Sequence, residues 1–291
     1  MTRPMIQPMI QPRLIGAEIM KIRTTRASWI FLATFTLLSA AALLTSVISH
    51  HDQLYPQQDL PGRAQALAQA AQLRTPAGAA TVAASMMTAG QFLTVLVAML
   101  LGIHIMTSEI GQRTLTATFL VTPRRERVIV AKLAAAVAFG ALFWLIATVL
   151  DGVVTPVFLA SQHVSASLTA PGVIRSVLLG LLAFVLWAAF GLGLGAVIRG
   201  QVASAVAGIA SYAGGAAAVE LSFPALYDVT HQGWLLGAPV LAPAVASLVM
   251  TTPAPAFPHA PPQWAGAAVM AGYALALAAA GIVQTRRRDV S

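Results

Sequence analysis

Apolar and polar residues are segregated along the chain into long apolar runs and short polar breaks. Six runs are each about long enough to cross the hydrocarbon core of a bilayer, which takes roughly 20 apolar residues. They predict an all-α integral membrane protein with a single transmembrane domain. The six predicted transmembrane helices are 27–49, 85–107, 128–150, 172–198, 202–221 and 265–283, which together define a domain over 27–283, with a segment 1–26 before it and a basic tail 284–291 after it.

An amphipathic helix is predicted just before the first span. Ile15, Ile19 and Ile22 recur at helical spacing on one stripe, while Glu18, Lys21 and Arg23 lie off that stripe. A helix with one apolar and one charged face is typical of a membrane surface, so we expect an N-terminal interfacial helix. A solvated leader to the first span is the alternative interpretation.

The composition indicates a membrane protein and not a nucleic-acid-binding one. Hydrophobic residues make up 58% of the 291 residues and charged residues only 9%, against roughly 25% charged residues in soluble domains. The net charge of +8 resides in short loops between apolar runs, so no nucleic-acid partner is expected. The sequence contains no cysteine, which excludes disulfides and thiolate metal ligands.

The basic residues cluster in alternate loops, and this predicts the orientation of the chain. Loops rich in Lys and Arg stay on the cytoplasmic side of a membrane. With six spans and both termini in the cytoplasm, all 17 Lys and Arg residues fall on that side except Arg63, Arg74 and Arg175. We therefore expect a multi-pass protein of the cell (cytoplasmic) membrane with cytoplasmic N- and C-termini.

Two segments outside the spans are predicted to be helical on the outer side. The first is 63–73, in the loop after the first span. The second is 233–250, which is close to the lower length limit for a span. A full crossing there would place the arginines at 286–288 outside the cell, and Pro239 and Pro243 interrupt the segment. We predict a helical hairpin between the fifth and sixth spans, either re-entrant or lying on the outer surface.

No nucleotide-binding motif is present. A phosphate-binding P-loop needs a lysine directly after a glycine, but the two lysines, Lys21 and Lys132, follow other residues. The pattern G-x-G-x-x-A at Gly191 lacks the strand and crevice of a dinucleotide site. Gly191 and Gly195 instead have the four-residue spacing that lets helices pack closely in lipid.

Three ionisable residues lie near membrane depth, where a charge costs roughly 2.5–3.5 kcal/mol on insertion scales. His104 is expected about one turn from the cytoplasmic end of its span, and Asp151 and Glu220 are expected at outer helix ends. Since none of the three is central, the sequence does not favour an ion-coupled mechanism.

The longest basic interruption, residues 108–132, joins the second and third spans. Leu115 and Phe119 are four residues apart and would share one face of a short helix, with Arg113 beside them. This small apolar face in a basic surrounding predicts contact with a partner protein. A loop folded under the bundle is the alternative.

Eight residues of this loop form a recognisable pattern: Glu109, Gly111, Thr114, Leu115, Thr122, Pro123, Arg124 and Lys132. The pattern resembles the Glu-x-x-x-Gly-Thr-Leu, Thr-Pro-x-x-Arg and Lys signature between the second and third helices of ABC-2-type transporter permeases. The resemblance implies the membrane-spanning permease subunit of an ATP-driven ABC exporter. Separate ATPase subunits would bind ATP and Mg²⁺, and a second permease, a copy or a homologue, would complete the pathway.

Under this resemblance the chain is no enzyme and holds no cofactor, and a cytoplasmic coupling helix in the loop docks on the ATPase. The expected substrate is hydrophobic or amphipathic (drug, lipid or peptide-like), and the arginines are expected to touch membrane lipid. An ATP-independent secondary carrier or a membrane scaffold protein is the alternative. The residues expected to couple the permease to the ATPase are Glu109, Arg113, Thr114, Leu115, Phe119, Pro123 and Arg124.

Overall fold

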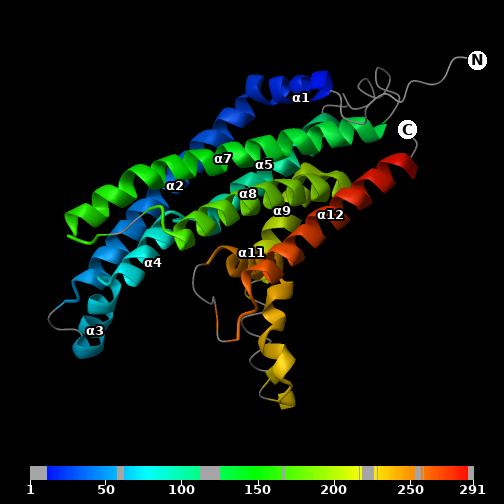
Figure 1. Cartoon of the computed structure of the whole chain (residues 1–291). Coiled ribbons are helices and arrows are strands. Elements are labelled where there is room, and N and C mark those ends of the chain that lie inside the picture. Colours follow the sequence, from blue (N-terminus) through cyan, green and yellow to red (C-terminus); the bar gives the residue numbers. More distant parts are fainter. Residues whose placement is uncertain are drawn as a thin grey trace, which may run out of the picture.

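The computed structural model describes residues 12–57, 62–111, 125–165, 168–215, 217, 226–227, 229–252, 257 and 259–287. Every regular element in these ranges is a helix, which confirms the all-α prediction (Figure 1). The elements are α1 (Pro12–Thr24), α2 (Arg26–Leu54), α3 (Arg63–Leu73), α4 (Pro76–Met86), α5 (Gln91–Gly111), α7 (Arg125–Ser161), α8 (Pro171–Ile198), α9 (Gln201–Ile209), η1 (Ala210–Gly214), η2 (Gly233–Leu236), η3 (Ala238–Leu241), α11 (Pro243–Thr251) and α12 (Gln263–Arg287).

Five helical segments are long and apolar enough to cross a membrane, so the chain has the makeup of a multi-pass membrane protein. Each contains one predicted span. The remaining predicted span, 202–221, begins as α9 and continues as the π-helical turn η1. Part of it, 216 and 218–221, lies outside the described residues, so the six-span count stays a prediction. The five segments are Arg26–Leu54, Pro76–Gly111, Arg127–Ser161, Pro171–Ile198 and Gln263–Gln284.

The second of these segments consists of α4 and α5 with a turn between them. Gly90 in that turn has a φ of 71°, and a Cβ atom at Gly90 would clash with the side chain of Ala42 in α2. Glycine therefore permits both the backbone conformation and the close approach of α2.

α7 extends past Leu150, to which the third span is predicted to run, with a continuation toward Phe158 as the alternative. The apolar run ends at Leu150, but the helix continues without a break to Ser161. The prediction that Asp151 lies at an outer helix end is therefore wrong. Asp151 lies inside the helix with only 2% of its surface exposed, because its side chain faces a polar cavity between helices and does not need to reach water.

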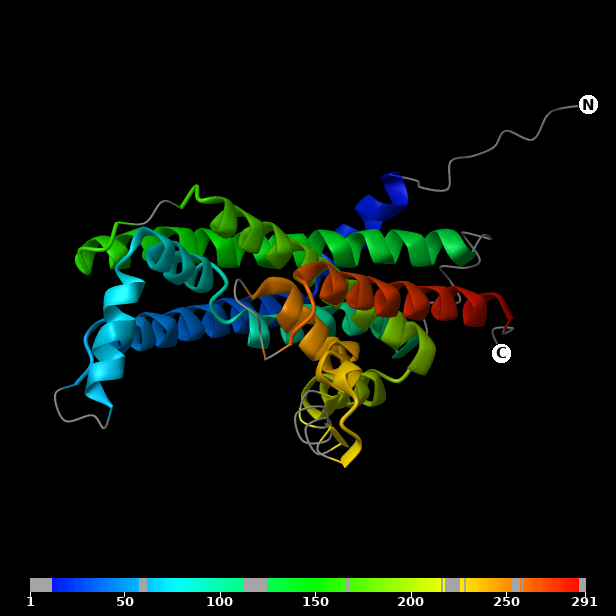
Figure 2. The ribbon, with the colours of Figure 1, turned by 60° about the horizontal axis from the view of Figure 1, so that its bottom comes forward.

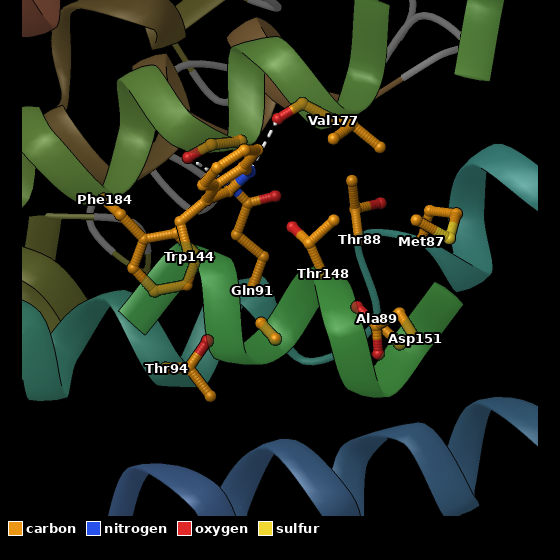
Figure 3. Close-up of a pocket in the computed structure, with 12 residues that line it drawn as sticks. Met87, Thr88, Ala89, Gln91, Thr94, Trp144, Thr148, Asp151, Val177 and Phe184 are labelled. Atoms are coloured by element: carbon orange, nitrogen blue, oxygen red, sulfur yellow. Dashed lines mark hydrogen bonds between the residues drawn. The ribbon is translucent and has the colours of Figure 1, made fainter. Parts of the chain in front are cut away.

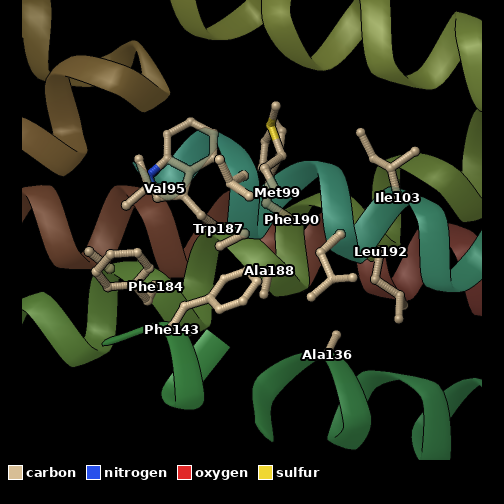
Figure 4. Packing of buried hydrophobic residues seen from close by; sticks show 14 of the residues in the cluster. Val95, Met99, Ile103, Ala136, Phe143, Phe184, Trp187, Ala188, Phe190 and Leu192 are labelled. Carbon is tan, nitrogen blue, oxygen red and sulfur yellow. The ribbon is translucent and has the colours of Figure 1, made fainter. Parts of the chain in front are cut away.

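α8 lies at the centre of the bundle and packs against α5, α7 and α12. Its Trp187 is fully buried, and Figure 4 shows it beside Val95 and Met99 of α5. The indole Nε1 donates a hydrogen bond to Ser247 Oγ of α11 at 3.0 Å. A buried indole needs such an acceptor, so this bond fixes α11 against α8.

The predicted close packing around Gly191 and Gly195 is confirmed. A Cβ atom at Gly191 would clash with the carbonyl oxygen of Met99, and one at Gly195 would lie 3.1 Å from a backbone oxygen of α5. Gly102 of α5 makes the reciprocal approach to Ala188. The backbones of α5 and α8 thus touch directly, as small residues allow in membrane helices.

Both helical segments predicted outside the spans are present. α3 has the predicted bounds. The segment 233–250 forms the 3₁₀ turns η2 and η3 and the nine-residue α11, whose first residue is Pro243. α11 packs against α8 and α12, and its Met250 is fully buried. Nine residues are too few to cross a bilayer, so this segment is a set of broken helices packed into the bundle.

Candidate functional site

One end of the bundle brings α1 together with the beginning of α7 and the end of α12 (Figures 1 and 2). α3 lies at the opposite end. We call these the α1 end and the α3 end. α5 also finishes at the α1 end, where Glu109 in its last turn contacts α1.

Four charged side chains from three helices meet at the α1 end, and we call them the ion network: Glu18 and Lys21 of α1, Glu109 of α5 and Lys132 of α7. Lys21 Nζ lies 2.9 Å from Glu18 Oε1 and 2.9 Å from Glu109 Oε1. Lys132 Nζ lies 2.8 Å from Glu18 Oε2 and 2.9 Å from Glu109 Oε1. Each lysine therefore bridges both carboxylates, and the four charges sum to zero.

Most of the ion network is shielded from solvent. The side chain of Lys132 is 2% exposed, those of Glu18 and Glu109 are 7% and 10% exposed, and that of Lys21 is 49% exposed. Lys132 also approaches the carbonyl oxygen of Ile105 at 3.5 Å. Removing one partner of a buried ion pair costs about 3–5 kcal/mol, because it leaves an uncompensated charge. The ion network therefore fixes α1 to both α5 and α7.

The apolar stripe of α1 points inward, and Glu18 points inward beside it. Ile22 and Glu18 are both buried. The prediction that Glu18 lies with Lys21 on a charged outer face is therefore wrong for Glu18. Its partner Lys132 is far away in sequence, so the pattern of α1 alone cannot reveal that the carboxylate is paired inside the bundle.

Lys21 is the accessible member of the ion network. Burial lowers the pKa of Lys21, but the hydrogen bonds that it donates to Glu109 and Glu18, together with their negative charges, outweigh burial and raise the pKa above the ordinary value of 10.5. Lys21 is therefore fully protonated at neutral pH, and the positive charge that balances the two carboxylates is constant there.

Of the seven predicted coupling residues, the structure describes Glu109. It places the Glu109 carboxylate between two lysines at the point where α5 ends. The pairing of Glu109 with Lys132, both members of the loop pattern, went unpredicted. The other six, Arg113, Thr114, Leu115, Phe119, Pro123 and Arg124, lie outside the described residues.

A second polar site surrounds Asp151 of α7. Figure 3 shows Asp151 and Thr148 facing Thr88 and Ala89, with Gln91 close by, in a cavity between α7, α8 and the turn before α5. The cavity has a volume of about 10 Å³, close to the space that one water molecule needs. Apart from Asp151, its lining residues are uncharged.

The other candidate residues contribute little to either site. His104 lies in the penultimate turns of α5, where Nδ1 is 3.4 Å from Gln201 Nε2. Glu220 lies outside the described residues. Across the described ranges, no three His, Cys, Asp or Glu side chains are grouped as a metal site would require.

The chain matches no protein-family model, and no curated protein is similar enough to count as a relative. The likeness to ABC-2-type permeases therefore rests on the loop pattern itself. Three of its eight residues, Glu109, Gly111 and Lys132, are within the described part of the chain.

Proposed function

We propose that this chain is the membrane-spanning permease subunit of an ATP-driven exporter of the ABC-2 type. The observation that supports it best is the contact between Glu109 and Lys132, the first and last residues of the loop pattern. Their 2.9 Å ion pair joins the helix that enters the loop to the helix that leaves it, and both residues also contact α1.

The ion network gives the loop a route to the rest of the protein. Residues 112–124 connect α5 to α7, so a partner that pushes on the loop displaces the end of α5 and the beginning of α7. Because both ends are paired with α1, they move together with it. α1 is followed directly by α2 after Thr25, so the displacement reaches the first span as well.

In this proposal the α1 end faces the cytoplasm. ATPase subunits that carry ATP and Mg²⁺ dock there on the loop, and a second permease packs beside this one in the membrane. The α3 end, with Arg63 and Arg74, faces outward, as does the hairpin at η2, η3 and α11. The cargo is a hydrophobic or amphipathic molecule. The wide exposed apolar face of α2, which includes Ile30 and Leu37, is suited to lipid, cargo or the second permease.

The test is to purify the tagged chain from its native membrane in mild detergent and to measure the ATPase activity that accompanies it. Leu115→Asp/Phe119→Asp places two charges on the proposed docking face, whereas Leu67→Asp is a control at the exposed surface of α3. We expect ATPase with the wild type and with Leu67→Asp, and none with the double variant. A wild-type chain that arrives without ATPase would refute the proposal.

A secondary carrier is the second candidate, because an ionisable residue buried in a span is typical of ion-coupled transport. Asp151 is such a residue and faces a polar cavity. If the chain is a carrier, the purified chain alone should dissipate an imposed proton gradient in vesicles that contain a pH-sensitive dye. Asp151→Asn should abolish this leak. A scaffold protein would do neither.

A further inference from the structure

An apolar groove at the α1 end is distinct from both polar sites. It lies between α1, α2, α5 and α7 and has a volume of about 300 Å³, the lower end of the range of about 300–1,000 Å³ for small-molecule sites. We call it the α1 groove. Residues that line it include Ile19 and Arg23 of α1, Trp29 and Leu32 of α2, and Phe139 and Leu142 of α7.

The α1 groove opens on the surface that faces the bilayer. Three of its four walls, α2, α5 and α7, belong to candidate membrane spans. Trp29 lines the groove and is 65% exposed, and Leu142 is exposed as well. Tryptophan is enriched at the level of lipid headgroups, so Trp29 places the mouth of the groove near that level and its apolar interior beside the acyl chains.

Arg23 is the one charged side chain in the lining. It forms no ion pair with the carboxylates that the structure describes, whereas Lys21, two residues earlier, is paired with two of them. A guanidinium matches a phosphate with two parallel hydrogen bonds. An apolar groove with an arginine at the headgroup level has the two features of a phospholipid site: space for an acyl chain and a cation for the phosphate.

We propose that the α1 groove binds an anionic phospholipid, with one acyl chain in the groove and the phosphate on Arg23. The guanidinium of Arg23 favours anionic over zwitterionic headgroups at the groove. Ile19 and Arg23 lie on one side of α1, and Glu18 and Lys21 of the ion network lie on the other. The bound lipid would therefore hold α1 from the side opposite to the ion network. This inference is independent of the proposed ATPase partner.

The test uses brominated phospholipids, which quench tryptophan fluorescence on contact. The full chain is reconstituted in vesicles that contain brominated phosphatidylglycerol or brominated phosphatidylcholine, and the signal of Trp29 is taken as the difference from Trp29→Phe. We expect the anionic probe to be preferred about fivefold, which is the effect of one arginine near a membrane surface. Arg23→Ala should reduce this preference to about one, and Arg26→Ala, an exposed neighbour that does not line the groove, should keep it.

A second variant tests the groove without touching the charge. Ala138 lines the groove and is exposed, so Ala138→Phe should fill the groove and lower quenching by both probes while the protein stays monodisperse. Equal quenching of wild-type Trp29 by both lipids would overturn the proposal. An anionic preference that persists in Arg23→Ala, or unchanged quenching in Ala138→Phe, would overturn it too.

Discussion

The ion network and the Asp151 cavity both hold buried ionisable groups, but the carboxylates of the ion network are paired with lysines, whereas uncharged side chains surround Asp151. At the α1 end, two carboxylates and two ammonium groups bridge one another within 2.9 Å. Around Asp151, the side chains that line the cavity are uncharged. Removing one charge from a compensated network leaves the others unpaired and is costly, whereas an ionisable group buried without a charged partner is itself costly and is typical of a functional group.

The difference is clearest in what a substitution should do. In the ion network, removing one charge leaves others unpaired in a dry site, so stability falls. At Asp151, removing the charge relieves an existing cost, so stability holds or rises. The two sites therefore have opposite expected responses, and each can be measured by thermal unfolding in detergent.

The largest expected effect is at Lys132. Lys132→Met removes the most buried cation of the ion network and leaves Glu18 and Glu109 with Lys21 alone. We expect a loss of about 3–5 kcal/mol, measured as a lower unfolding temperature, with earlier proteolysis of α1. Adding Glu18→Gln to Lys132→Met restores one-to-one pairing between Lys21 and Glu109 and should recover part of the loss. An unchanged unfolding temperature in Lys132→Met would contradict this account.

The opposite response is expected at Asp151. Asp151→Asn keeps the shape of the side chain and removes the ionisable group. The free energy of unfolding should therefore stay the same or rise by up to about 3 kcal/mol, which is the insertion cost of an aspartate. The same melting assay measures it. Asp151→Leu is the control, because it replaces the carboxyl group with an apolar side chain in the cavity that Thr88 and Thr148 also line. A large destabilisation by Asp151→Asn would mean that the carboxylate is paired after all.

A smaller effect is expected at Lys21, because its side chain is half-exposed and solvent screens its interactions. We expect Lys21→Met to lose about 1 kcal/mol. Since the folded pKa of Lys21 is raised above 10.5, its contribution is complete below that pH and is lost as the pH rises through the folded pKa. The difference in melting temperature between wild type and Lys21→Met should stay constant from neutral pH to about pH 10 and shrink above that. A difference that disappears by about pH 8 would contradict the raised pKa.

The two sites also show which structural features the sequence predicts and which it does not. The apolar runs were sufficient to predict five helices that are long and apolar enough to span a membrane, and the glycine spacing was sufficient to predict the close packing at Gly191. The bounds of α3 were predicted as well. Each of these features depends on residues that are near one another in the sequence. The resemblance pointed to Glu109. The same pattern contains Lys132, but the pairing of Glu109 with Lys132 and Lys21 was not predicted, because pairing across three helices has no local pattern.

The error at Asp151 has the same origin. A charge after an apolar run normally marks the end of a span. The third span was therefore predicted to run to about Leu150, with a continuation toward Phe158 as the alternative, and Asp151 was placed at an outer helix end. Asp151 instead lies in a cavity that it lines together with Thr148 of α7, with Thr88 just before α5 and with Gln91 at the start of α5. That cavity forms only when α7 meets the turn before α5, and no single apolar run reveals it.

The smallest expected effect is at Gly180, on the α8 wall of the cavity. A Cβ atom there would lie 3.6 Å from the Gln91 amide and from Trp144 Cδ1, an ordinary contact distance. Gly180→Ala should therefore fit and gain up to about 1 kcal/mol from helix propensity, seen as a slightly higher unfolding temperature. Gly191→Ala is the matched control, since its added Cβ clashes with backbone and should destabilise the protein.

Gly180→Ala also tests transport. Because Gly180→Ala narrows the cavity and leaves every charge in place, a proton leak that depends on Asp151 should fall in this variant. If the chain is a permease and the cavity is only a packing defect, Gly180→Ala should leave its association with the ATPase unchanged.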